Sequence, residues 1–114
     1  MKMTASTRLV DGVTIVDLSG RIVLGDGSAG LRDLVRDLAR EGTKKILLNL
    51  GNVDYIDSSG LGELVCAFTS MRNQGGEVKL LNLTKKIQDL LAITKLLTVF
   101  EVYDSEDEAT RSFN

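Results

Sequence analysis

A short polar stretch joins a predicted strand to a predicted helix near the middle of this chain. The strand is expected from the apolar run 45–50, and the helix from the apolar residues of 61–68, which recur at helical spacing. Residues 57–60, Asp-Ser-Ser-Gly, therefore lie where the exit loop of a strand becomes the N-terminus of a helix. Free backbone N–H groups and the positive end of the helix dipole favour anions there. The two adjacent hydroxyls are accordingly candidates to carry a phosphoryl group that switches a function.

The rest of the chain extends this alternation of strands and helices. Strands are expected at 4–10, 13–18, 45–50, 78–83 and 99–103. Helices are expected around 31–39, from the central loop to about residue 73, after Thr84 and after Ser105. Asp11 and Gly12 suit a two-residue hairpin turn, which makes the first two strands antiparallel, and Gly20 is expected to end the second strand. Short later loops imply parallel strands joined by helical crossovers. The prediction is a single α/β domain over residues 1–114, ββαβαβαβα, with a mixed, mostly parallel sheet of about five strands and four helices.

Charge and composition disfavour several classes of function. The net charge is −2 and only 4% of the residues are aromatic. Nucleic-acid-binding surfaces are basic and often carry aromatic side chains on which bases stack. No apolar run approaches the roughly 20 residues that span a bilayer, and the start of the chain lacks the apolar segment of a signal peptide. We therefore expect a cytoplasmic protein that neither binds nucleic acid directly nor inserts into a membrane.

The chain has no histidine and a single cysteine. Without histidine, zinc sites and Ser-His-Asp or Cys-His nucleophile pairs are excluded in their usual form. Cys66 falls in a predicted helix and is expected to be a small core residue. A metal site at Asp54 and Asp57 is disfavoured, because only neutral oxygens accompany these two carboxylates. Any enzyme built on this chain would have to use carboxylates, hydroxyls or lysines.

The central motif has both a structural and a functional explanation. Asp57, Ser58 and Ser59 are all good N-cap residues, so capping alone would account for them. Gly60 and Gly62 fit that explanation less well, because a glycine inside a helix costs roughly 0.8–1.0 kcal/mol relative to alanine. Small residues there bring the backbone close either to a neighbouring strand or to a docking partner. Both explanations stay open from the residues alone.

The run 57–62, Asp-Ser-Ser-Gly-Leu-Gly, placed after an apolar strand, resembles that of the bacterial anti-sigma factor antagonists. These are the stand-alone STAS domain proteins, also called anti-anti-sigma factors. The resemblance includes Leu-Ser-Gly at 18–20, Ile-Leu-Leu-Asn-Leu at 46–50, the glycine pair 75–76 and the lengths between these marks. It implies the STAS, or SpoIIAA-like, fold over the whole of residues 1–114.

The resemblance also implies a partner-switching protein. In that family the unphosphorylated antagonist binds an anti-sigma factor that is itself an ATP-dependent serine kinase, and so frees the sigma factor. The kinase phosphorylates the serine directly after the aspartate, here Ser58, and a metal-dependent serine phosphatase reverses the modification. The rest of the implied partner-binding loop consists of Asp57, Ser59, Gly60, Leu61 and Gly62. The protein would be a substrate and a ligand rather than an enzyme, with no cofactor and no metal of its own.

Two alternatives to this function stay open at the level of sequence. A STAS domain can also be a scaffold subunit of a stress-sensing complex or of a membrane transport complex. The glycine-rich segment 25–30 opens a helix and could bind a phosphate. Gly-Arg-Ile-Val at 20–23 replaces the Gly-Glu-Leu-Asp run frequent in the family, which bears on the partner that is recognised. Leu61 could belong either to the core or to the partner interface. Leu64 is expected in the core.

Overall fold

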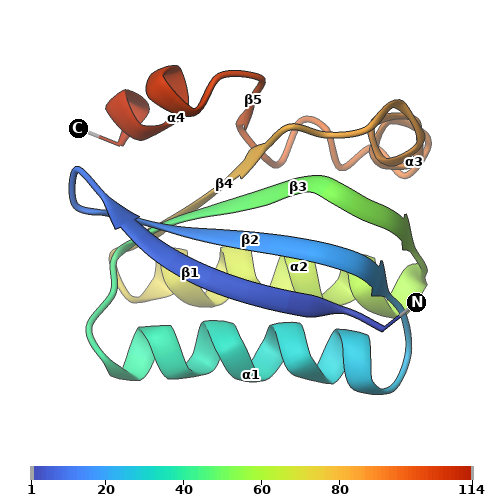
Figure 1. The fold of residues 1–114 in the computed structure, drawn as a ribbon, viewed down its shortest axis with the longest axis horizontal. Coiled ribbons are helices and arrows are strands. Elements are labelled where there is room, and N and C mark those ends of the chain that lie inside the picture. Colours follow the sequence, from blue (N-terminus) through green and yellow to red (C-terminus); the bar gives the residue numbers. More distant parts are fainter. Residues whose placement is uncertain (1, 114) are drawn as a thin grey trace.

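The computed structural model describes residues 2–113, and within this range the chain forms a five-stranded sheet flanked by helices (Figure 1). The elements in chain order are β1 (Thr4–Val10), β2 (Val13–Ile22), α1 (Asp26–Arg40), β3 (Lys45–Ile56), α2 (Ser58–Asn73), β4 (Glu77–Leu81), α3 (Lys85–Ile93), β5 (Val102–Tyr103) and α4 (Glu106–Ser112). The order ββαβαβαβα and the α/β class are as predicted. The sheet is mixed and mostly parallel, since β1 pairs antiparallel with β2 and the other neighbours pair parallel.

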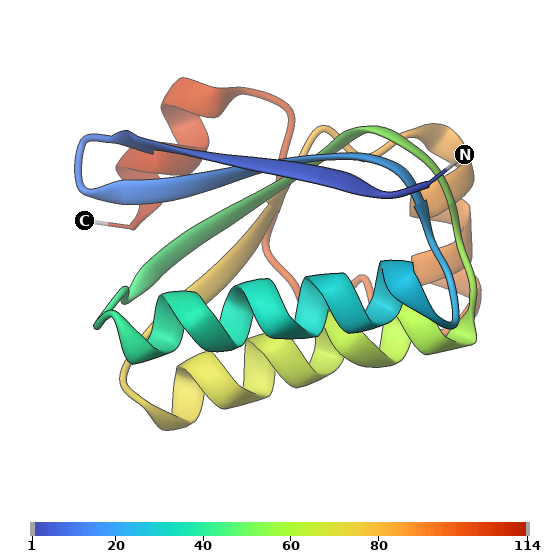
Figure 2. The same ribbon diagram turned by 60° about the horizontal axis from the view of Figure 1, so that its bottom comes forward.

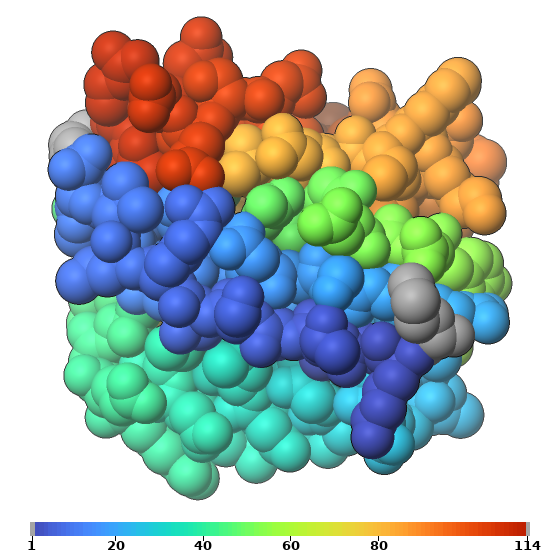
Figure 3. All heavy atoms as spheres, in the orientation of Figure 1, coloured from blue at the N-terminus to red at the C-terminus, as the bar shows by residue number. Residues whose placement is uncertain are grey.

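The strands follow one another in the sheet in the order β1-β2-β3-β4-β5. β1 is an edge strand and lies at the surface between α1 and α4 (Figure 3). Helices α1 and α2 lie side by side on one face of the sheet (Figure 2). The parallel register of β2 and β3 places Ile22 opposite Ile56, the last residue of each strand. The exit loops of both strands therefore meet at one edge, which is where residues 57–60 lie.

Two apolar cores form because successive side chains of a strand face opposite sides of the sheet. The larger core lies against α1 and α2 and takes from the central strands Val16, Leu18, Ile46, Leu48 and Leu80. The smaller core lies under α4 and contains Val13, Ile15, Leu47, Leu81, Ala109 and Phe113. Most members of both cores are less than 2% exposed. This double burial explains why the central strands are nearly continuous apolar runs rather than alternating ones.

Turns and helix ends have the local geometry that their residues favour. The β1–β2 turn has positive φ at Asp11 (51°) and Gly12 (82°), as a two-residue hairpin turn of the predicted kind requires. The hydroxyl of Thr84 accepts a hydrogen bond from the backbone N–H of Ile87 at the start of α3. Gly42 follows α1 with a φ of 85° and so allows its last turn to close in the left-handed conformation.

Several strand and helix boundaries differ from the prediction. Gly20 does not end β2; it lies inside the strand with a φ of 92°, where an added Cβ would meet the carbonyl oxygen of Lys2 at 2.3 Å. β3 continues to Ile56 because Val53 and Ile56 still point into the core with 1% exposure. Conversely, β4 ends at Leu81 and β5 is reduced to Val102–Tyr103. Helix α1 begins at Asp26, so it starts earlier than the helix expected around 31–39.

Two side chains lie where the sequence did not indicate. The prediction that Cys66 belongs to the core is wrong, because its side chain is exposed on the outer side of α2. Lys79, by contrast, is only 4% exposed in β4. Its ammonium donates hydrogen bonds to the carbonyl oxygen (2.9 Å) and the hydroxyl (3.0 Å) of Ser112 and lies 4.6 Å from the ring centroid of Phe113. The charge itself is paired with the carboxylates of Glu77 (3.6 Å) and Glu101 (3.5 Å), as a buried charge requires, and the hydrogen bonds to Ser112 fasten α4 to the sheet.

Candidate functional site

The candidate site lies at the sheet edge where β2 and β3 end and α2 begins. Asp57 is the N-cap of α2, and its backbone is extended (φ −96°, ψ −174°). Its N–H donates to the carbonyl oxygen of Ile22, the last residue of β2, at 3.3 Å. The loop is therefore joined through its backbone to the strand beside it.

The carboxylate of Asp57 links two segments that are far apart in the sequence. Its Oδ1 atom accepts a hydrogen bond from the N–H of Gly60, and its Oδ2 atom accepts one from the N–H of Leu24, both at 2.9 Å. The N–H groups of Leu24 and then Gly60 hold the pKa of this carboxyl below its ordinary value, since they favour the charged form. Asp57 thus fixes the β2–α1 loop against the start of α2.

The two serines differ in their surroundings. Ser58 is the first residue of α2 and is exposed, whereas Ser59 is half-buried. The side chain that caps the helix belongs to Asp57 and not to Ser58. A phosphoryl group on Ser58 would therefore leave the cap in place, and it would lie at the positive end of a 16-residue helix.

The two glycines of the motif serve different purposes. Gly60 is buried, and a Cβ added to it would lie 2.2 Å from the carbonyl oxygen of Ile22 and 2.7 Å from Cγ2 of Ile56. Close packing of α2 on the strand ends therefore accounts for Gly60. Gly62 has open space around its position, with nothing within 4 Å of an added Cβ. It presents bare backbone to the outside, as a docking surface would.

Leu61 of the motif and Leu64, which follows it in α2, belong to the core. Leu64 is 0% exposed, as predicted, and Leu61 is 8% exposed. Little of the Leu61 side chain is left for a partner to contact. Of the implied partner-binding loop, the residues with accessible surface are Asp57, Ser58, Ser59 and Gly62.

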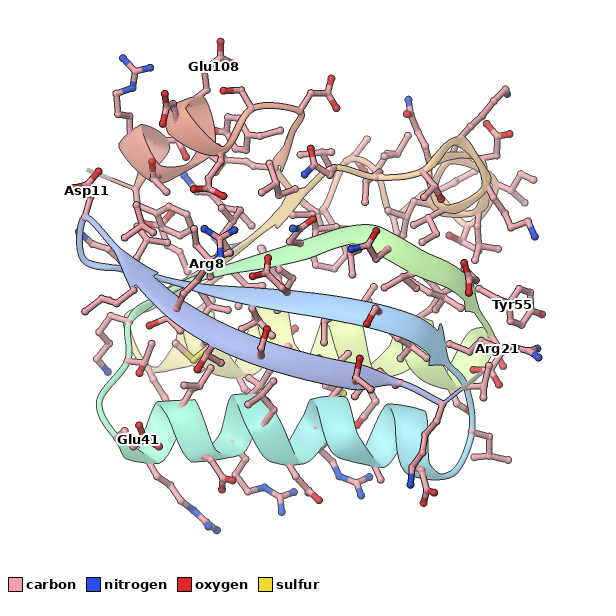
Figure 4. All side chains as sticks on the ribbon, viewed as in Figure 1. Arg8, Asp11, Arg21, Glu41, Tyr55 and Glu108 are labelled. Atoms are coloured by element: carbon pink, nitrogen blue, oxygen red, sulfur yellow. The ribbon has the colours of Figure 1, made fainter. Side chains whose placement is uncertain are left out.

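Three further residues at this edge have the surface of an interaction site. Leu24, in the loop held by Asp57, is 78% exposed, and Tyr55 at the end of β3 is 41% exposed. The guanidinium of Arg21 lies over the ring of Tyr55, 5.2 Å from its centroid, and the two side chains lie together at one end of the sheet (Figure 4). Arg21 belongs to the run 20–23 that departs from the family pattern, whereas no sequence pattern indicated that Leu24 and Tyr55 would be exposed beside it.

The carboxylates and the glycine-rich segment near this edge have the following surroundings within the described residues. Within residues 2–113 no cluster of three or more potential metal-ligating side chains is present. In segment 25–30, Gly27 and Ser28 are buried, and an added Cβ on Gly27 would lie 2.7 Å from the carbonyl oxygen of Arg21. Packing of α1 on the end of β2 thus accounts for Gly27. None of the helices in the described part of the chain has the length and apolar character needed to cross a bilayer.

Comparison with known proteins places this geometry in a family. The family model of the STAS domain matches residues 4–109 of this chain. BtrV of Bordetella bronchiseptica, described as a candidate anti-sigma factor antagonist, is 30% identical over 116 residues that cover 99% of this chain and 95% of that protein. The anti-sigma F factor antagonist of Paenibacillus polymyxa is 29% identical over 98 residues, covering 86% and 84% of the two chains.

A solved structure agrees with these relatives. The crystal structure of a candidate anti-sigma factor antagonist from Thermotoga maritima superposes with a TM-score of 0.88 at 27% sequence identity, covering 96% of this chain and 93% of the other. The resemblance noted in the motif therefore extends to the whole fold. The chain belongs to the STAS domain family and has its fold.

Proposed function

We propose that this protein is an antagonist of an anti-sigma factor and that phosphorylation of Ser58 switches its binding. In the unmodified state it binds an anti-sigma factor that is also an ATP-dependent serine kinase, so that the sigma factor is released. The kinase transfers the γ-phosphoryl group of ATP to the Ser58 oxygen, ADP leaves, and a base of the kinase takes the hydroxyl proton. A metal-dependent serine phosphatase hydrolyses the ester. The protein is a substrate and a ligand in this cycle rather than an enzyme, and the cycle runs in the cytoplasm.

The position of Ser58 is the observation that carries this proposal. Its side chain is exposed at the first position of α2, while Asp57 supplies the cap and ties the neighbouring loop. The hydroxyl can therefore be modified without removing a contact on which the fold depends. Relatives named as anti-sigma factor antagonists support the same role.

The electrostatic effect of the modification is large enough for a switch. Phosphorylation adds about −1.5 to −2 charge at pH 7. The helix N-terminus tolerates this charge within the protein, whereas a partner surface fitted to a neutral hydroxyl would face a like or desolvated charge costing several kcal/mol. A penalty of about 3–4 kcal/mol weakens binding by roughly two to three powers of ten. The switch thus acts at the interface and leaves the fold intact.

The test is affinity capture from the lysate of the native host with three baits: wild type, Ser58→Asp and Thr69→Asp. Thr69 is an exposed hydroxyl residue further along α2 and controls for added charge alone. We expect a kinase-like anti-sigma factor on wild type and on Thr69→Asp, and its loss from Ser58→Asp. One large complex held equally by all three baits would contradict the switch and favour a scaffold subunit of a stress-sensing or membrane transport complex.

A further inference from the structure

A groove of about 480 Å³ runs between α1 and α2 on their outer side, where it is not part of the site described above. Its floor is apolar and built from Val35, Ala39 and Ala67, and Cys66 lies on its α2 wall. The groove exists because small side chains, among them alanine and serine, occupy positions at which larger ones would close the space between two adjacent helices. Its volume lies in the range typical of small-molecule sites, about 300–1,000 Å³.

One wall of the groove is positively charged, although the chain as a whole carries −2. Arg32, Arg36 and Arg40 recur at every fourth residue of α1 and line this wall. Their ion pairs are long and exposed: Arg36 lies 3.8 Å from Asp33, and Arg40 lies 3.8 Å from the next aspartate of the helix. Such surface pairs contribute little, so an anion can compete for the guanidinium groups.

The opposite wall fixes the direction in which a ligand would lie. Glu63 is 15% exposed, and its Oε2 atom is buried without a hydrogen-bond partner within the described residues, 3.9 Å from a guanidinium nitrogen of Arg32. The Glu63 carboxylate offsets the charge of Arg32 and repels the anionic group of a ligand from the end of the groove where Arg32 and Glu63 lie. Arg36 and Arg40 are left as the pair that faces an anion, with the apolar floor beside them.

We propose that this groove binds a small amphipathic organic anion, with its carboxylate or phosphate on Arg36 and Arg40 and its apolar body over Val35, Ala39 and Ala67. Guanidinium groups are suited to both headgroups, because their fork of N–H donors matches the geometry of carboxylate and phosphate oxygens. The occupant is a free molecule rather than a lipid within a bilayer, since the apolar surface lies at the bottom of a groove between two helices. The site is separate from Ser58, and its failure would leave the proposed switch unaffected.

Cys66 provides the assay, since it is the only cysteine, is exposed and lines the groove. The rate of its alkylation by N-ethylmaleimide, a neutral reagent, is measured by mass spectrometry with decyl phosphate below its micellar concentration. We expect saturable protection by decyl phosphate, and none by inorganic phosphate or by a neutral decyl glycoside at equal concentration. Three results would overturn the proposal: equal protection by the neutral decyl glycoside, protection by anionic lipid vesicles but not by decyl phosphate, or no protection by any of these.

Two variants and a matched control complete the test. Arg36→Gln combined with Arg40→Gln should raise the half-protecting concentration of decyl phosphate about tenfold or more, the loss of at least one charge-assisted contact. Arg111→Gln removes an exposed arginine from α4 and should leave the concentration unchanged. Ala39→Leu should abolish protection by filling the groove. Equal behaviour of the double variant and Arg111→Gln would refute the proposed anion site.

Discussion

Two glycines of one helical turn should respond in opposite ways to the same substitution. In Gly60→Ala the new methyl group would lie 2.2 Å from the carbonyl oxygen of Ile22, where ordinary contact begins near 3.4 Å. Either the end of β2 or the start of α2 has to move by about 1 Å, and overpacking of this kind costs about 1–3 kcal/mol, occasionally more. In Gly62→Ala the methyl group meets nothing within 4 Å. That variant should gain about 0.5–1 kcal/mol from the higher helix propensity of alanine.

Thermal and urea denaturation of the two variants and wild type measure the difference. For a domain of this size 1 kcal/mol corresponds to about 4 °C in melting temperature. We therefore expect a fall of roughly 4–12 °C for Gly60→Ala and a rise of roughly 2–4 °C for Gly62→Ala. Destabilisation of both variants to the same extent, or a neutral Gly60→Ala, would refute the assignment of Gly60 to packing. Loss of partner binding by the stable Gly62→Ala would in addition assign Gly62 to the interface.

Further predictions concern the anchor of α4, the exposed leucine and the two carboxylates with lowered pKa values. Lys79→Ala should destabilise the protein by about 2 kcal/mol or more in urea denaturation, because it strips two hydrogen bonds from Ser112 and packing from beneath α4; an unchanged midpoint would contradict this. Leu24→Ser should weaken partner binding roughly 5–30-fold in calorimetry with an unchanged melting temperature, and an unchanged affinity would remove Leu24 from the interface. Hydrogen bonds from Arg8 lower the pKa of Asp17, and hydrogen bonds from backbone N–H groups lower the pKa of Asp57. Both carboxylates therefore stabilise the folded state above the ordinary pKa of about 3.9, and this stabilisation is lost as the pH falls through their pKa values in the folded protein. The urea concentration at the unfolding midpoint, measured from about pH 6 to about pH 3, should decrease once the pH is below about 4, and it should decrease less steeply in Asp57→Asn. Identical pH profiles of wild type and Asp57→Asn would contradict the role of this carboxylate.

The sequence was sufficient for the order of elements and for placing the candidate site between a strand end and a helix start. Helix periodicity, the Asp11-Gly12 turn and the cap residues are local signals, and they appear in the structure as a buried helix face, two positive φ angles and cap hydrogen bonds. The position of Ser58 at a helix start followed from the same local signals. Whether Gly60 packs against a strand or faces a partner could not be decided, because the answer depends on Ile22, which is 38 residues away in the chain and adjacent to Gly60 only in the fold.

The features that sequence could not supply are those set by neighbours in space. Cys66 looked like a core residue by type, but the rotation of α2 on the sheet turns it outward into a groove shared with α1. Lys79 lies in the predicted fourth strand, and no sequence pattern indicated that the C-terminal helix would cover its ammonium. Gly20 was expected to end β2, while its positive φ allows the strand to continue beside the backbone of Lys2. In each case tertiary packing overrode a local preference.

The most direct test of the switch follows phosphate and partner together. The complex of this protein with its captured kinase-like partner is incubated with ATP, and the phosphorylated residue is mapped by mass spectrometry while release of the partner is recorded. A Ser58→Ala variant, which keeps the Asp57 cap, is the matched control. We expect a single phosphate on Ser58 and release of the partner in step with it, and neither in Ser58→Ala. Phosphate on another residue, or modification of Ser58 without release of the partner, would contradict the proposed switch.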